Sequence, residues 1–180
     1  MEGALNVRKI VISGVLGAVA IFLGATRLGF VPVPTAAGNA TIMHVPAIIG
    51  GIMEGPLVGA IIGTIFGLFS FLQATTPLFK DPLVAVLPRI FIGVTTFLVY
   101  APLKKANEYL ALIVAAVVGT FTNTILVLGM AVLRGYIPGG VALGIGVTQG
   151  IPEAVVAAII STAVVAAWKR LETGRAKAKI

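Results

Sequence analysis

The sequence predicts an all-α membrane protein, a compact bundle of six transmembrane helices with both termini cytoplasmic. Of its 180 residues, 58% are hydrophobic and only 11% are charged, and the mean hydropathy is +1.09. Soluble domains carry about 25% charged residues. The apolar residues gather in six runs, and the cations lie mainly at the ends of those runs. The net charge of +7 therefore indicates membrane topology and attraction to anionic lipid, and it argues against nucleic acid as a partner.

We expect a single domain over residues 1–180. Its predicted helices are residues 8–28, 41–53, 56–74, 83–103, 109–133 and 145–170. A helix needs about 20 residues to span the bilayer, so the second run is short.

The breaks between these helices follow from turn-forming and charged residues. Residues 29–40 contain Pro32 and Pro34 and read as a loop. Gly55 ends the second run, and Pro56 suits the first turn of the third helix. The later breaks are a polar loop at 75–82, a charged turn at 104–108 and a Gly- and Pro-containing loop at 134–144.

Six spans place both termini on the same side of the membrane. The distribution of charged residues then indicates which side that is. With the termini inside, nine cations lie on the inner face and three on the outer face, which agrees with the positive-inside rule. The inner set is Arg8, Lys9, Lys104, Lys105, Lys169, Arg170, Arg175, Lys177 and Lys179, and the outer set is Arg27, Lys80 and Arg134. The three outer connections are the long ones, which favours a lid over an outward-facing cavity, with ordinary connectors as the alternative.

Small residues at helical spacing predict close helix packing. Glycines recur every four residues, at positions 51, 55, 59, 63 and 67, although the spacing does not identify the neighbouring helix. On the first helix, Gly14 and Ala18 form a small-residue face that suits either intramolecular packing or a partner helix.

Polar residues within the apolar runs are candidates for substrate binding, because ionisable groups at membrane depth are costly. Arg89 can hold a carboxylate in a forked geometry, or it can pair internally with Glu153. The complete candidate set is Asn39, Thr41, His44, Gln73, Arg89, Asn123, Gln149 and Glu153. Amides such as Asn123 and Gln149 also serve as hydrogen bonds between helices, which is their commoner role.

The sequence contains no catalytic motif, no phosphate-binding loop and no cysteine. We therefore expect no enzymatic activity, no cofactor and no metal. Active transport would require energy from a partner or from an ion gradient, and the lack of a visible inverted repeat favours the partner over an autonomous secondary transporter.

Three segments carry a resemblance to a known family. These are 12–20 after a basic start, 40–49, and Glu54-Gly55-Pro56, where Glu54 replaces the usual aromatic residue. The chain resembles the S components of energy-coupling factor (ECF) vitamin transporters over nearly its full length. The resemblance implies a prokaryotic plasma-membrane subunit that captures a vitamin outside and works with a transmembrane T component and two ATPases. It also implies that Gly14 and Ala18 contact the T component.

The substrate is predicted from the same resemblance. Residues 39–44, 87–90 and 119–124 are most similar to pantothenate-type members. A cation such as Arg89 suits a carboxylate vitamin, and Asn and Thr side chains suit its hydroxyl and amide groups. Riboflavin or another B vitamin remains an alternative substrate, and a stand-alone facilitator or a structural membrane protein remains an alternative function. A pore would need a continuous polar stripe, whereas the polar groups here gather toward the outer half.

Overall fold

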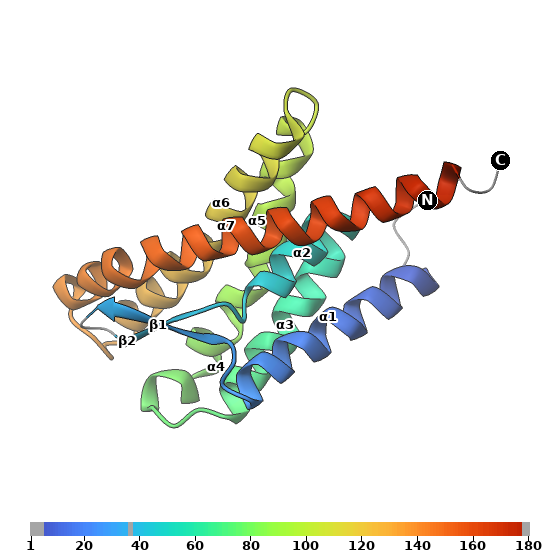
Figure 1. Cartoon of the computed structure of the whole chain (residues 1–180). Coiled ribbons are helices and arrows are strands. Elements are labelled where there is room, and N and C mark those ends of the chain that lie inside the picture. The colour runs from blue at the N-terminus through green and yellow to red at the C-terminus, as the bar shows by residue number, and fades with distance from the viewer. Residues whose placement is uncertain (1–5, 36–37, 178–180) are drawn as a thin grey trace.

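The computed structural model describes residues 6–35 and 38–177, with side chains described outside 31–35, 38–40 and 173–177. It contains a bundle of six helices and a two-stranded hairpin (Figure 1). In chain order the elements are α1 (Val7–Ala25), β1 (Phe30–Thr35), β2 (Gly38–Thr41), α2 (Val45–Glu54), α3 (Pro56–Leu72), the 3₁₀ turn η1 (Pro77–Lys80), α4 (Pro82–Ala85), α5 (Leu87–Leu103), α6 (Glu108–Leu133) and α7 (Gly139–Lys177).

Four of the described helical segments are long and apolar enough to cross a membrane: Val7–Ala25, Pro82–Leu103, Glu108–Leu133 and Gly139–Glu172. The shorter α2 and α3 have 10 and 17 residues. They are separated at Gly55, whose φ of 100° is a left-handed conformation that glycine adopts without strain. The predicted six helices are confirmed, with α4 and α5 together forming the fourth.

The first outer connection differs from the predicted loop. It forms an antiparallel hairpin in which Phe30 pairs with Thr41 and Val31 with Ala40. Because Thr41 belongs to β2, α2 begins at Val45 and not at residue 41. The first helix ends at Ala25 and not at residue 28, because the φ of 59° at Arg27 is incompatible with a right-handed helix.

The start of the last helix was also predicted wrongly. The structure begins α7 at Gly139 and not at residue 145, so the third outer connection is shorter than expected. The long α7 crosses the view from the hairpin toward the side where α1 begins (Figure 1). The first turn of α1 and the last turns of α7 thus lie on the same side of the molecule.

The predicted glycine groove packs α3 against α5 of the same chain. A Cβ at Gly59 would lie 2.6 Å from the Cα of Gly93, and one at Gly67 would lie 2.8 Å from the Cα of Val86. A Cβ at Gly63 would lie 2.8 Å from the carbonyl carbon of Arg89. These contacts are with backbone atoms, so only glycine permits this approach.

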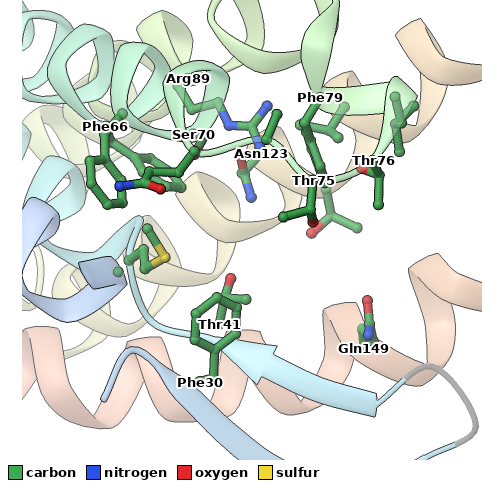
Figure 2. Close-up of a pocket in the computed structure, with 18 of the residues that line it drawn as sticks. Phe30, Thr41, Phe66, Ser70, Thr75, Thr76, Phe79, Arg89, Asn123 and Gln149 are labelled. Carbon is green, nitrogen blue, oxygen red and sulfur yellow. The ribbon is translucent and has the colours of Figure 1, made fainter. Parts of the chain in front are cut away.

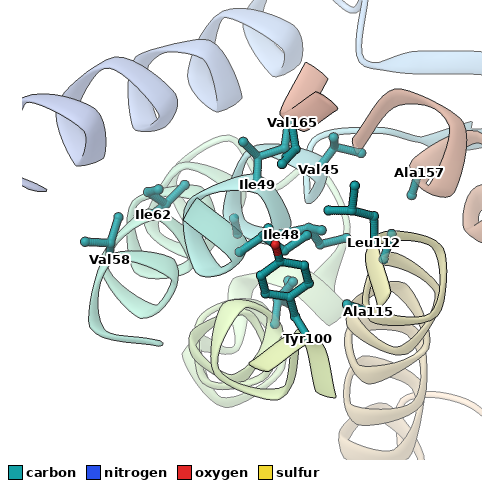
Figure 3. Close-up of a cluster of buried hydrophobic side chains, with 14 of the residues drawn as sticks. Val45, Ile48, Ile49, Val58, Ile62, Tyr100, Leu112, Ala115, Ala157 and Val165 are labelled. Atoms are coloured by element: carbon teal, nitrogen blue, oxygen red, sulfur yellow. The ribbon is translucent and has the colours of Figure 1, made fainter. Parts of the chain in front are cut away.

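The main hydrophobic core is built from α1, α2, α3, α5, α6 and α7. Ile48 of α2 contributes a fully buried side chain, and Leu112 of α6 and Tyr100 of α5 pack in the same cluster (Figure 3). At the end of the bundle where α1 begins, Arg8 bonds Glu54 at 2.8 Å and Glu172 at 2.9 Å. This pair of contacts ties α1 to α2 and α7.

Candidate substrate-binding cavity

A cavity of about 830 Å³ opens among the end of α1, the hairpin, the end of α3, η1 and helices α5, α6 and α7. Its volume suits a vitamin-sized ligand, since small-molecule pockets measure about 300–1,000 Å³. The lining is Gly24, Ala25, Arg27, Phe30, Thr41, Met43, Phe66, Phe69, Ser70, Gln73, Ala74, Thr75, Thr76, Leu78, Phe79, Arg89, Asn123, Thr124, Val127, Leu128, Ile137, Ile145, Gln149 and Glu153.

Arg89 is placed by the break between α4 and α5. Pro88 has no backbone N–H, so it cannot donate to the carbonyl of Val84 four residues earlier. That carbonyl instead accepts a hydrogen bond from Nη1 of Arg89. The proline therefore breaks the helix and frees the acceptor that orients the guanidinium.

The guanidinium of Arg89 carries a charge without an acidic partner. The residue is 5% exposed, and its Cζ lies 5.4 Å from the ring centre of Phe66 and 5.2 Å from that of Phe79. These aromatic rings attract the cation. Among the described residues, no carboxylate pairs with Arg89, and its Nε has no hydrogen-bond partner. The expected alternative of an internal Arg89–Glu153 ion pair is therefore wrong.

Asn123 lies beside this cation. It projects from α6 into the same region of the cavity as Arg89, on the wall opposite Thr41 and Gln149 (Figure 2). Its Oδ1 is buried and lacks a partner within the described part of the chain. The guanidinium of Arg89 and the side-chain amide of Asn123 lie on the same wall of the cavity, and together they match a ligand that has an anionic group next to a hydrogen-bonding group.

Glu153 and Thr41 join the hairpin to α7. The Oε1 atom of Glu153 accepts a hydrogen bond from the backbone N–H of Thr41 at 2.7 Å. Both residues line the cavity, and Glu153 is 6% exposed. This bond fixes the end of β2 against α7, so the hairpin forms one wall of the site.

His44 does not line the cavity, contrary to the sequence-based prediction. It is fully buried, and its Nε2 lies 3.0 Å from Oγ1 of Thr120. That hydroxyl donates its single proton to the carbonyl of Ala116 at 2.9 Å, so it must accept from Nε2–H. His44 therefore joins α2 to α6 behind the site.

Of the eight predicted residues, the cavity brings together Thr41, Gln73, Arg89, Asn123, Gln149 and Glu153. The side chain of Asn39 lies outside the described side chains. Sequence reasoning missed the aromatic lining, Phe30, Phe66, Phe69 and Phe79, and also Ser70. Phenylalanines in an apolar run carry no signal that separates a ligand wall from a lipid-facing or core position.

An ion pair supports the η1–α4 wall of the cavity. Oδ2 of Asp81 accepts from Nε of Arg134 at 2.7 Å, and its Oδ1 accepts from the backbone N–H of Leu83 at 3.0 Å. The Arg134 guanidinium holds the pKa of the Asp81 carboxyl below its ordinary value. The bridge anchors the turn that places Phe79 over Arg89.

The two faces of α1 have different neighbours. A Cβ at Gly17 would lie 2.8 Å from Ile65, so that face packs on α3. Gly14 and Ala18 are exposed, and Gly14 has no atom within 4 Å of a Cβ. The intramolecular alternative for this second face is therefore wrong.

Among the described residues, no group of three His, Cys, Asp or Glu side chains could hold a metal.

Comparisons with known proteins agree with this architecture. A family model described as "ECF transporter, substrate-specific component" matches residues 8–165. The pantothenic acid transporter PanT of Lactococcus lactis subsp. cremoris (strain MG1363) is 35% identical, in a match that covers 71% of this chain and 76% of that protein.

Two solved structures share the fold. ThiT from Listeria monocytogenes superposes with a TM-score of 0.68 at 15% identity, covering 91% of this chain and 96% of that chain. The S component of a bacterial ECF transporter gives a TM-score of 0.63 at 19% identity, with 92% and 96% covered. The family and the apolar helices fit a multi-pass protein of a prokaryotic plasma membrane. The chain belongs to the substrate-specific components of ECF transporters, which are transport subunits and not a class of enzymes.

Proposed function

We propose that this chain captures pantothenate from the outer face of the membrane and passes it to an ATP-driven module. Pantothenate has a carboxylate at one end, two hydroxyls at the other and an amide between them. Arg89 binds the carboxylate, and the side-chain amide of Asn123 hydrogen-bonds to the ligand. The aromatic lining contacts its apolar carbons. The 35% identity to a pantothenic acid transporter supports this substrate.

The observation that carries the proposal is the uncompensated charge of Arg89. Desolvating a charge costs several kcal/mol unless an opposite charge or hydrogen bonds offset it. Arg89 has one carbonyl and two aromatic rings around it, with Nε unsatisfied. A ligand carboxylate supplies the missing opposite charge.

The proposed orientation places both termini in the cytoplasm and the cavity mouth outside. Its support is the side of the bundle on which each cation lies. The cavity mouth has Arg27, and Lys80 and Arg134 lie in the neighbouring connections. The larger group of cations lies around the first turn of α1, the α5–α6 turn and the end of α7. The positive-inside rule assigns that end to the cytoplasm.

The proposed partners are a transmembrane T component and two ATPases, because no nucleotide-binding motif occurs in the sequence. Gly14 and Ala18 present a small-residue surface that none of the helices in the described residues covers. Such a surface allows close approach of a partner helix in lipid. We propose that the T component docks on this face.

Equilibrium binding of radiolabelled pantothenate to the purified chain tests the substrate and the site. We expect the wild type to bind pantothenate saturably and unlabelled riboflavin not to displace it. In Arg89→Ala we expect the affinity for pantothenate to fall by about 100-fold, since truncating one partner of a buried charge pair costs about 2–5 kcal/mol. Lys80→Ala removes an exposed outer cation that does not line the cavity, and it should bind as the wild type does. Absence of binding by the wild type would show that pantothenate is not the substrate. Full affinity in Arg89→Ala would show that Arg89 does not bind it.

A further inference from the structure

The cavity contains a second buried charge, and its sign is opposite to that of Arg89. Glu153 projects from α7 and lines the cavity, whereas Arg89 belongs to α5. Helix α6 packs against both α5 and α7 and lies between them. Figure 2 shows Arg89 on the wall opposite Gln149, which lies one helical turn before Glu153. The site is therefore bipolar, with a cation at one wall and a carboxylate at the other.

The contacts of Glu153 do not account for its charge. Within the described residues its hydrogen-bond donors belong to Thr41, the backbone N–H at 2.7 Å and the side chain, and no cation lies within 4.0 Å. A carboxylate offers about four lone-pair sites, so part of its accepting capacity remains. A glutamine would make the same bond to Thr41 without the cost of desolvating a charge. Holding the hairpin therefore explains the bond but not the negative charge.

We propose that Glu153 determines which end-groups the cavity accepts. It receives a hydrogen bond from a neutral donor, such as a hydroxyl, at the end of the ligand opposite the carboxylate bound by Arg89. It repels any ligand that carries a second anionic group at that end. The site therefore selects a monoanion with one polar neutral end over a dianion of the same length. This inference rests on the proposed function, because it takes Arg89 as the carboxylate site.

The consequence is exclusion of phosphorylated ligands. A phosphate ester at the terminal hydroxyl would place negative charge against the carboxylate of Glu153 in a desolvated cavity. Juxtaposed like charges cost several kcal/mol, so we expect the ester to bind at least about 100-fold more weakly than the parent alcohol.

The test measures binding of pantothenate and of its phosphate monoester at the primary hydroxyl. Glu153→Gln keeps an oxygen for the N–H of Thr41 and removes only the charge. We expect it to bind pantothenate up to about 10-fold more weakly, because the ligand hydroxyl then meets a neutral acceptor, and to reduce the ratio of pantothenate affinity to ester affinity by at least about 10-fold. Glu153→Asp keeps the charge and should keep the exclusion. Glu54→Gln removes a negative charge at the opposite end of the bundle and serves as the matched control.

The outcomes separate the two proposals. An unchanged preference in Glu153→Gln, or wild-type binding of the ester as tight as that of pantothenate, would overturn the role of Glu153 and leave the pantothenate site standing. Failure of the wild type to bind pantothenate would overturn the proposed function and this inference with it. Monodispersity and the melting temperature of each variant confirm that the fold is intact.

Discussion

Gly63 sets the position of the binding arginine from the neighbouring helix. A Cβ at this position would lie 2.8 Å from the carbonyl carbon of Arg89 and closer still to its oxygen, whereas ordinary contacts begin at 3.4 Å. In Gly63→Ala, α3 and α5 must therefore separate by at least about 0.6 Å, because backbone atoms cannot rotate away as a side chain can. We expect a loss of about 1–3 kcal/mol in stability from overpacking.

The same displacement should weaken binding, since a site must be held to within about 0.5 Å of its productive geometry. We expect pantothenate affinity to fall by about 10-fold or more in Gly63→Ala, which corresponds to about 1.4 kcal/mol. The assay is equilibrium binding to folded protein, with a melting temperature measured in parallel. Gly129→Ala is the matched control, because nothing lies within 4 Å of a Cβ at that position in α6. Wild-type affinity and melting temperature in Gly63→Ala would refute the proposed packing of Arg89.

Three further predictions concern other parts of the molecule. Thr120→Val leaves the buried Nε2–H of His44 without its acceptor and should lower the free energy of unfolding by about 1–3 kcal/mol, measured by thermal melting. An unchanged melting temperature would contradict the His44 tautomer that carries its proton on Nε2. The lowered pKa of Asp81 means that its bridge to Arg134 stabilises the fold at neutral pH and is lost as the pH falls through that pKa. The melting temperature of the wild type should therefore decrease more below about pH 4 than that of Asp81→Asn, and equal decreases would show that the bridge contributes nothing. Gly14→Leu should bind pantothenate normally yet fail to co-purify with the T component and the ATPases. Normal co-purification would show that the T component docks on a face of the protein other than that of Gly14.

The sequence predicted the bundle because its signals are strong in a membrane chain. Long apolar runs allow few structures other than spanning helices. The four-residue glycine spacing predicted tight packing, although only the structure identifies α5 as the neighbour. Arg89 and Glu153 stood out because charges in apolar runs are rare, and both line the cavity.

Features that depend on tertiary contacts could not be read from the sequence. The hairpin was missed because Pro32 and Pro34 indicated a loop, and proline cannot donate to a sheet ladder. His44 was expected at the site because it follows an outer connection, but it turns inward to Thr120. The absence of an Arg89–Glu153 ion pair depends on which helices lie adjacent, and α6 separates the two that carry these residues.

The claim tested most directly is that Arg89 binds the ligand carboxylate. A double-mutant cycle compares pantothenate with its neutral primary amide on the wild type and on Arg89→Ala by isothermal titration. We expect the wild type to prefer the carboxylate by about 100-fold and Arg89→Ala to show at most a few-fold preference, because the discrimination resides in that guanidinium. If Arg89→Ala retained the full preference for the carboxylate, another group would bind the anion and this account of the site would be wrong.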